Sequence, residues 1–563
     1  MNRRSFFSLV VVGLLLAVCV PAASSAARRV PKLVVILVVD QLRADYVEKF
    51  GHNWTGGLRR LIDEGAWFRQ AAYPYMTLVT CVGHSTIVTG SLPRTHGVVA
   101  NAWWDREKGA TAACVADADE SLISYGAPAR GGTSTRNLLV PAFPDELRFQ
   151  AGTAPRIVTA SMKDYTATTM AGRRADAVVW FSGTARAFAT SSAFTNAPVP
   201  FVERFVKAHP IEAYFGKTWT KLLPESAYLY TDDAVGEYPW PKGTNRFPHE
   251  LRGTGNTPDA DFYAAWEQSP FSDEYLGLFA EEAIDTLKMG QGPGTDYLAI
   301  SFSALDLAGH DFGPRSHEVQ DMLARLDRTL GSLMTHLDRR VGRQNYVLAL
   351  TGDHGVAPVP EQVAEFDLPG GRVSGTELVA RVEKALEPAL GPGKKVSSLG
   401  YNGLYFAPGV FSKLQADPAA MRAVLETVQS FPGVARVFRA DELSHPFANL
   451  DDPTERSAAA NFYPGRSGDL IIALRPYYIF STSSAGGASH GAGYPYDQNV
   501  PIFLLGQGIR PGQYLSASGP MDIAPTLAFL CGITLPSSDG RVLSEALLPF
   551  PARASAPAAA VKK

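Results

Sequence analysis

Residues 297–354 decide the fold: they open with the apolar run YLAISF (297–302) and close with NYVLALTGDH (345–354). Both ends are continuous apolar runs, which are typical of strands buried on both faces of a parallel sheet. Between them, residues 319–337 repeat Val, Met and Leu at steps of three and four, which indicates a helix with one apolar face. The order strand, helix, strand predicts a βαβ unit.

A third apolar run, Leu33–Val39, joins these two, and an aspartate follows each run. Asp40 ends the first, Asp306 follows the second after a short turn, and Asp353 ends the third. Open α/β sheets bind ligands at the carboxyl ends of their strands. The sequence therefore predicts an α/β fold with a mostly parallel central sheet flanked by helices. In this fold the three aspartates would lie together at the edge formed by the carboxyl ends of the strands.

The remaining chain is more irregular, and we interpret residues 27–550 as one catalytic domain with two insertions. Residues 105–285 are rich in Thr, Gly, Pro and aromatic residues and are expected to form a large cap. Residues 360–485 form the second insertion, with a strand-like run at 470–474 and an amphipathic segment at 421–428. The chain returns to the core through an apolar run at 501–505 and a helix at 523–530.

The N-terminus has the features of a secretory signal peptide, residues 1–26. Two arginines precede an apolar stretch (6–20) that is too short for a confident membrane span, and small residues follow it. We expect a periplasmic or secreted protein with no membrane attachment after cleavage. A lipoprotein ending its leader before Cys19 is the alternative. The Ala/Pro-rich tail, 551–563, is expected to be disordered.

Composition narrows the classes of partner. The chain has 563 residues, 46% of them hydrophobic, and a net charge of −3, so no general basic field favours nucleic acid as an obligate partner. Cys81, Cys114 and Cys531 would remain after cleavage, which is too few for a disulfide framework. A Cys81–Cys114 bridge and two buried thiols both remain open.

Histidines accompany the aspartates in a pattern suited to metal. His310 lies four residues after Asp306, His354 follows Asp353 directly, and His490 sits in a loop of small residues. With Asp40 these make six nitrogen and oxygen ligands, the types that zinc prefers. Each of them alone would more often be a cap, a turn residue or a core residue. Together they predict two Zn²⁺ ions in open sites of three ligands each, an arrangement suited to phosphoester chemistry.

These motifs, taken in order, resemble the type I phosphodiesterase/nucleotide pyrophosphatase branch of the alkaline phosphatase superfamily, and within it the PafA-like threonine alkaline phosphatases. The matching residues are Val39-Asp40, Thr80-Cys-Val-Gly-His84, Asn101, Asp306-x-x-x-His310, Asp353-His354 and His490-Gly. The resemblance implies an alkaline phosphatase-like fold. It also implies that Asp40, Asp353 and His354 hold one zinc, which binds the Thr80 oxygen, and that Asp306, His310 and His490 hold the other.

The resemblance further implies that Thr80 is the nucleophile, that Asn101 hydrogen-bonds a phosphoryl oxygen and that Lys163 marks a monoesterase. A threonine hydroxyl needs its pKa lowered before it attacks, and a bound metal supplies that effect. An amide and a lysine suit the charge on the equatorial oxygens. Thr80 also precedes a predicted helix over 85–89, whose N-terminus favours an anion. His84 and His96 are expected to be structural.

One position departs from the monoesterase pattern, because Tyr165 stands where the group carries an arginine. Tyrosine carries no positive charge and cannot donate a bidentate hydrogen bond, so binding of a dianionic phosphate should be weaker. Arg173 and Arg174 lie nearby in sequence as possible substitutes. The sequence therefore predicts an exported phosphate monoester hydrolase acting on small phosphoesters. A phosphodiesterase or nucleotide pyrophosphatase is the alternative, and a non-enzymatic metal-binding protein is a remote one.

A sulfatase and a serine hydrolase fit less well. Cys81 is followed by Val-Gly-His-Ser, so the Cys/Ser-x-Pro-x-Arg segment of sulfatases is absent. The Gly83–Ile87 segment lacks the final glycine of a serine nucleophile elbow.

Overall fold

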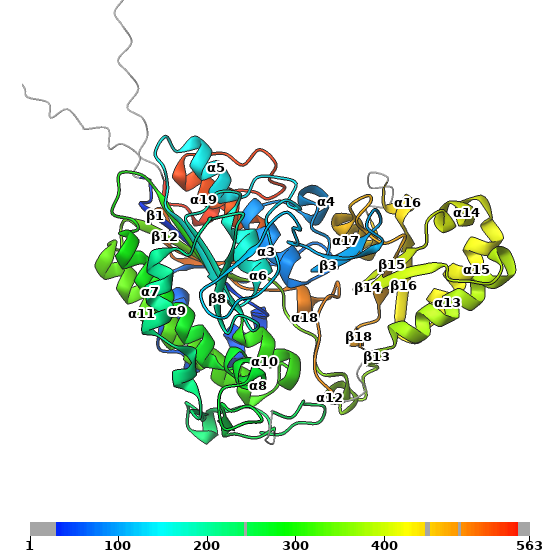
Figure 1. Ribbon diagram of the computed structural model, residues 1–563, viewed down its shortest axis with the longest axis horizontal. Coiled ribbons are helices and arrows are strands. Elements are labelled where there is room, and N and C mark those ends of the chain that lie inside the picture. The colour runs from blue at the N-terminus through cyan, green and yellow to red at the C-terminus, as the bar shows by residue number, and fades with distance from the viewer. Residues whose placement is uncertain (1–29, 241–244, 445–450, 482–485, 550–563) are drawn as a thin grey trace, which may run out of the picture. The chain divides into compact units, whose positions relative to one another are not determined.

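A ten-stranded sheet forms the centre of the protein (Figure 1). The computed structural model describes residues 30–240, 245–444, 451–481 and 486–549, and Val30–Leu548 make one compact unit. The expected leader, 1–26, and the expected tail, 551–563, lie outside the described residues. None of the described helices is both long and apolar enough to cross a bilayer.

Five neighbouring strands in the middle of the sheet run parallel, so the predicted fold class is confirmed. They are β12 (Tyr346–Gly352), β1 (Leu33–Val39), β11 (Asp296–Phe302), β6 (Ile157–Ser161) and β7 (Ala177–Ser182). Antiparallel pairings extend the sheet at both sides. On one side follow β19 (Ile502–Gly506) and β2 (Ala66–Phe68), and on the other β8 (Ala187–Ser191) and β5 (Leu122–Ser124). At the outer edge, β20 (Gly512–Tyr514) pairs parallel with β2.

Side-chain alternation along β1 divides the core into two layers. Leu33, Val35, Leu37 and Val39 face one hydrophobic cluster, which includes α9 (Pro270–Leu287) and α11 (His317–Arg340). The intervening residues face the other cluster, which includes α3 (Thr80–Thr89) and α19 (Ile523–Cys531). Successive residues of a strand point to opposite faces, so a fully apolar strand needs helices on both sides. Figure 1 shows these helix pairs on the two sides of the sheet.

The three predicted strands end level with one another. Val39 pairs in register with Phe302 of β11 and with Gly352 of β12. The residues that follow therefore emerge side by side at one rim. α10 (Ala304–Phe312) begins directly after β11 and carries Asp306 in its first turn.

The 105–285 segment differs from the expected cap, because β5, β6, β7 and β8 all lie within it and extend the central sheet. These strands have three to six residues and carry Thr, Ser and Ala among their apolar positions, so their local pattern is weak. Pairing with β11 decides their structure. The helical part of the segment, including α8 (Ala260–Glu267) and α9, packs beside the sheet in the same cluster as α11.

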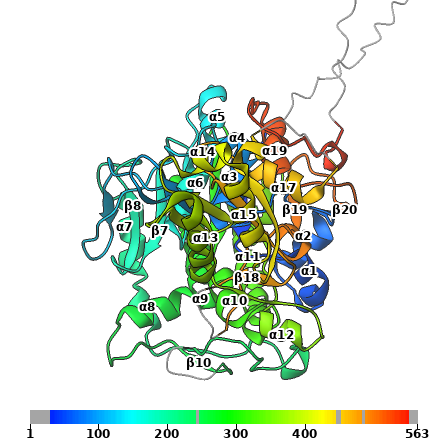
Figure 2. The ribbon, with the colours of Figure 1, turned by 90° about the vertical axis from the view of Figure 1, so that its right-hand side faces the viewer.

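The 360–485 segment contains a second sheet of four strands: β14 (Val396–Gly400), β15 (Gly403–Phe406), β17 (Leu470–Leu474) and β16 (Val434–Arg439). The predicted strand at 470–474 and the predicted helix at 421–428 are both present, the latter within α15 (Pro418–Gln429). With α13 (Gly375–Leu390) they enclose a hydrophobic cluster of their own. Figures 1 and 2 show these helices on the outer side of that sheet.

A disulfide joins Cys81 to Cys114, so the bridged alternative applies. Cys81 is the second residue of α3, and Cys114 directly follows β4 (Ala110–Ala113). The bridge ties the start of α3 to the hairpin of β3 (Ala102–Asp105) and β4.

Candidate active site

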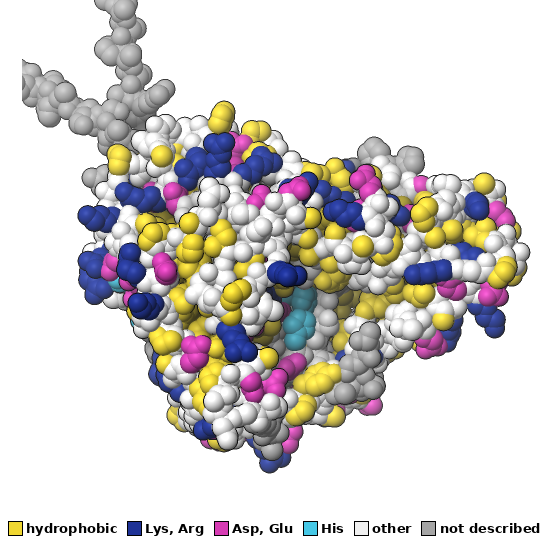
Figure 3. Space-filling view, in the orientation of Figure 1, with side chains coloured by type: hydrophobic (Ala, Val, Ile, Leu, Met, Phe, Trp, Pro, Cys, Tyr) yellow, Lys and Arg dark blue, Asp and Glu magenta, His cyan; other side chains and the backbone are white. Residues whose placement is uncertain are grey.

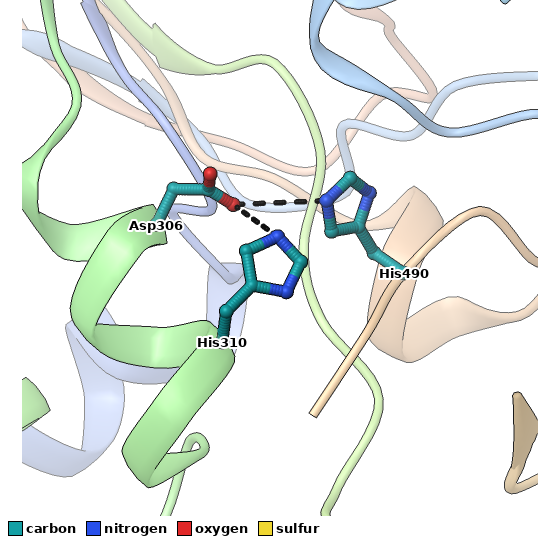
Figure 4. Close-up of side chains that lie close together, drawn as sticks. All are labelled: Asp306, His310 and His490. Atoms are coloured by element: carbon teal, nitrogen blue, oxygen red, sulfur yellow. Dashed lines mark ion pairs between the residues drawn. The ribbon is translucent and has the colours of Figure 1, made fainter. Parts of the chain in front are cut away.

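The predicted ligands converge at the carboxyl ends of the parallel strands. Asp306 Oδ1 lies 3.4 Å from His310 Nε2 and 3.7 Å from His490 Nε2. Figure 4 shows the two imidazoles pointing at the same carboxylate, one from α10 and one from the loop before α18 (Pro495–Gln498). His310 follows Asp306 by one helical turn, which is why both side chains share a face.

The second ligand set lies directly beside the first. Asp40 and Asp353 are fully buried, and His354 Nε2 lies 3.2 Å from Asp353 Oδ2. The His354 ring stacks on the His490 ring with 3.6 Å between centroids. The six predicted ligands therefore form one contiguous cluster.

All three histidines of the cluster have a fixed orientation, because each donates its Nδ1–H to a backbone carbonyl. The acceptors are Ala488 for His310 at 3.0 Å, Gly355 for His354 at 2.8 Å and Leu78 for His490 at 2.6 Å. A carbonyl can only accept, so the Nε2 lone pair of each ring faces the cluster. Burial lowers the pKa of His354 to about 4 and that of His490 well below its usual value, which keeps both rings neutral.

Some carboxylate oxygens of the cluster lack hydrogen-bond donors. Asp40 Oδ1 and Asp353 Oδ2 are buried and have no hydrogen-bond partner among the described residues. Buried carboxylate oxygens are normally paired, so this orphaned pair beside neutral imidazoles fits a cation. Nitrogen and oxygen donors in two neighbouring sets suit zinc in particular.

Lys163 supplies the only amino group recorded as an ion-pair partner of these aspartates among the described residues. Its Nζ lies 2.7 Å from Asp40 Oδ2 and 2.5 Å from Asp306 Oδ2. Burial works to lower the pKa of Lys163, but the Asp306 and Asp40 carboxylates outweigh it and the pKa is raised. The lysine therefore remains a cation between the two ligand sets.

His84 lies near Asp40 and Asp353 but is poorly suited as a ligand. Its Nδ1 donates to the Thr80 carbonyl at 2.8 Å, and its Nε2 accepts from the Ser301 hydroxyl at 2.9 Å. Both ring nitrogens are thus engaged. The fully buried His96 accepts the Val98 N–H at Nδ1, 3.1 Å away.

Thr80 lies at the start of α3 with its hydroxyl in the cluster. Its Oγ1 is 3.2 Å from His354 Nε2, and the residue is 1% exposed. The preceding Val79 is extended, so the helix begins at the threonine and its first N–H groups face the same space. Asn101 Oδ1 accepts from the Cys81 N–H at 2.7 Å, which orients the amide beside Thr80.

Tyr165 and Lys163 both open onto a cavity of about 400 Å³, with Glu267 in its wall. Lys163 caps α6 (Asp164–Ala171), and Tyr165 is the second residue of that helix. Arg173 and Arg174 are exposed beyond the opposite end of α6, so the structure does not bring them to the cluster. No arginine of α6 or its flanks replaces the one missing at position 165.

Two residues that the sequence did not single out hold the cluster together. Gln41 donates its N–H to Asp353 Oδ1 at 3.0 Å and its Nε2 to Asp306 Oδ1 at 2.8 Å, so it links the two ligand sets. Asp497 accepts from the N–H groups of Gly491 and Ala492 at 2.9 and 2.8 Å and fixes the His490 loop. The only sequence signal for Gln41 is its place directly after Asp40.

Comparison with known proteins agrees with this geometry. Residues 34–493 match a family described as type I phosphodiesterase / nucleotide pyrophosphatase. The chain is similar to alkaline phosphatase PhoV of Synechococcus elongatus, with 32% identity over 92% of this chain and 93% of the relative. It is also similar to alkaline phosphatase PafA of Elizabethkingia meningoseptica, with 29% identity over 92% and 94%.

A crystal structure of wild-type PafA superposes with a TM-score of 0.84, at 28% identity, over 92% of this chain and 99% of that one. The chain therefore belongs to the type I phosphodiesterase/nucleotide pyrophosphatase family, in its PafA-like alkaline phosphatase group.

Proposed function

We propose that this chain hydrolyses phosphate monoesters through a phosphothreonine at Thr80, with two zinc ions as cofactors. The observation that carries the proposal is the position of the Thr80 hydroxyl, buried at a helix N-terminus and 3.2 Å from His354 Nε2. The names of the relatives support the ester class, since PhoV and PafA are both alkaline phosphatases and both align with nearly the whole chain.

Two ligand sets would hold the metals. Asp306, His310 and His490 lie close enough together to share one ion. Asp40 and Asp353 lie in a second group with His84, but both ring nitrogens of His84 are engaged, so we assign His354, 3.2 Å from both Asp353 Oδ2 and Thr80 Oγ1, as the third ligand of the set beside Thr80. Bound zinc would supply Lewis acidity, lowering the pKa of an alcohol or water and countering phosphoryl charge.

The reaction would proceed in two displacements. Thr80 Oγ1 attacks phosphorus, its proton is lost to solvent, and the bond to the leaving oxygen breaks to release an alcohol. Water then attacks the phosphothreonine in the reverse sense and frees inorganic phosphate and the Thr80 hydroxyl. The N–H groups at the start of α3 face the bound anion, and Asn101 and Lys163 hold its equatorial oxygens.

Phosphodiester hydrolysis is the second candidate, and Tyr165 is the observation that favours it. A diester carries one negative charge where a monoester carries two. A site without the arginine therefore loses less binding energy for a diester than for a monoester. The buried Lys163 still provides one cation, which favours the monoester.

Paired substrates would separate these candidates. We expect purified protein to contain two zinc ions per chain, to cleave p-nitrophenyl phosphate faster than bis-p-nitrophenyl phosphate, and to lose both activities on chelation. Thr80→Ala should reduce monoester turnover by about a thousandfold or more, whereas Thr80→Ser keeps a hydroxyl and should retain more. Faster turnover of the diester, or unchanged activity in Thr80→Ala, would contradict the proposal.

We also propose that the chain is exported. The leader pattern of residues 1–26 supports this, and the Cys81–Cys114 disulfide suits an oxidising compartment. N-terminal sequencing of the mature protein should begin after Ala26. An intact N-terminus on the cytoplasmic fraction would contradict export.

A further inference from the structure

A cavity of about 390 Å³ opens beside the cluster and is lined by His310, His490 and Asn101 but not by Asp353. In phosphoryl transfer the attacking and leaving oxygens lie roughly in line. Because Thr80 approaches from the His354 side, the leaving group departs over His310 and His490 and enters this cavity.

The wall of this cavity is largely apolar. Met76, Leu474, Tyr478, Ile479, Phe480 and Tyr494 all line it. No lysine or arginine is among its described lining residues, and its only carboxylate is Asp497, whose Oδ2 accepts two backbone N–H groups. Figure 3 shows histidine side chains in a hollow with hydrophobic side chains beside them. Such a wall disfavours a leaving group that bears further negative charge.

Tyr401 stands at the mouth of the cavity in an unusual backbone conformation. It occupies the two-residue turn between β14 and β15 with a φ of 51°, a region that large side chains seldom adopt. Backbone strain of this kind concentrates at functional sites. The ring is 38% exposed and lines the cavity, so burial in a core does not explain the strain.

The turn lies against the cluster. Asn402 Nδ2 donates to the Gly491 carbonyl at 3.0 Å, and Tyr401 lines the same cavity as Asn101 and His490. The 360–485 segment thus reaches the loop of His490. The Tyr401 ring is therefore held at the wall of the cavity that opens beside the cluster.

We propose that this cavity, closed by the Tyr401 ring, is a leaving-group subsite that selects uncharged, ring-bearing alcohols. The inference rests on the proposed function and adds the class of ester that the site prefers. An aromatic ring in the cavity would pack against Tyr401 and the aliphatic wall.

Benzyl phosphate and glycerol phosphate test the subsite, since both release an alkoxide and only one carries a ring. We expect kcat/KM for benzyl phosphate to exceed that for glycerol phosphate by about tenfold or more, as burial of a phenyl ring allows. Tyr401→Ala should remove most of that preference, lowering kcat/KM for benzyl phosphate far more than that for glycerol phosphate. Tyr401→Phe should keep the preference because it keeps the ring.

Tyr230→Ala is a matched control, since Tyr230 is 40% exposed, has a φ of 72° and does not line the cavity. Equal kcat/KM for the two esters, or an unchanged preference in Tyr401→Ala, would overturn the subsite. If neither ester is cleaved, the proposed function fails, and calorimetric binding of benzylphosphonate against ethylphosphonate still decides the subsite. Tighter binding of the benzyl compound that Tyr401→Ala abolishes would support it, and equal binding would overturn it.

Discussion

Lys163 is the residue on which the electrostatic balance of the metal-free cluster depends. It is the cation between Asp40 and Asp306, and its side chain is 9% exposed. Removal of one partner from a buried ion pair costs about 3–5 kcal/mol, because the remaining charge stays buried. We expect Lys163→Met to lower the free energy of unfolding of the chelator-treated protein by about that amount, as measured by urea titration.

Lys221→Met is the matched control, because Lys221 also pairs with two carboxylates, Glu225 at 2.9 Å and Asp232 at 2.8 Å, away from the cluster. Added zinc should restore the stability of Lys163→Met, since the metal replaces the missing cation, but not that of Lys221→Met. Equal rescue of both variants would contradict this role of Lys163.

We expect Tyr165 to determine how strongly the site prefers a dianion. Its side chain opens onto the same cavity as Lys163. A guanidinium at this position adds a charge and paired donors for phosphate oxygens. We expect Tyr165→Arg to lower KM for a monoester by about tenfold, the effect of one added charged hydrogen bond, with little change for a diester.

Tyr165→Phe is the control for this substitution, since it removes the hydroxyl and adds no charge. We expect it to leave the ratio of monoester to diester kcat/KM nearly unchanged. If Tyr165→Arg lowered KM equally for the monoester and the diester, the arginine would not discriminate between one and two negative charges on the phosphate.

Helix α3 approaches the end of β12 so closely that only glycine fits at the contact. A Cβ added to Gly83 would lie 2.2 Å from the Asp353 carbonyl oxygen and 2.8 Å from the Asp353 Cβ. Overpacking of a tight contact costs about 1–3 kcal/mol. We expect Gly83→Ala to lose that much stability and to bind zinc more weakly, because Asp353 must shift.

Gly183→Ala is the control for α3, since a Cβ there meets no atom within 4 Å. Thermal unfolding and zinc titration of both variants check the prediction. Wild-type zinc affinity in Gly83→Ala would show that the close approach of helix and strand does not position the ligand.

The stability of the protein as a whole should depend on pH through a buried pair outside the ligand cluster. Glu318 on α11 lies 2.7 Å from His249 Nε2 in β10 (His249–Glu250). Burial raises the pKa of Glu318 from 4.5 to about 8 and lowers that of His249 from 6.5 to about 4. Both groups are therefore neutral near pH 7, with the carboxyl proton donated to the imidazole.

A raised folded-state pKa of an acid means that the native state holds a proton that the unfolded state has released. The contribution of protonated Glu318 to the free energy of unfolding is thus fully present below pH 4.5, and it is lost as pH rises through about 8. Below pH 6.5 the lowered pKa of His249 gives an opposite slope, because the unfolded state binds that proton, so we expect the free energy of unfolding to fall, by up to about 1.4 kcal/mol per pH unit, only between about pH 6.5 and 8. Glu318→Gln should flatten that slope in urea titrations, and an unchanged slope would contradict the assignment.

Much of the fold could be predicted from local pattern. The β1, β11 and β12 strands and the α11 helix are encoded in runs and periods shorter than 25 residues, so neighbouring positions suffice to reveal them. The strands β5 to β8 were missed because they are short and only partly apolar, and their structure depends on pairing with β11 and with one another.

The sequence by itself determined the βαβ core, the three aspartates at its rim and the histidines that follow two of them, because strand ends and helical turns fix such placements locally. Only the tertiary structure decided that Gln41 links the two ligand sets, that Cys81 pairs with Cys114 and that Asn402 reaches the loop of His490. Those contacts join segments far apart in the chain. Their geometry comes from the packing of whole layers against one another, which no local pattern of residues encodes.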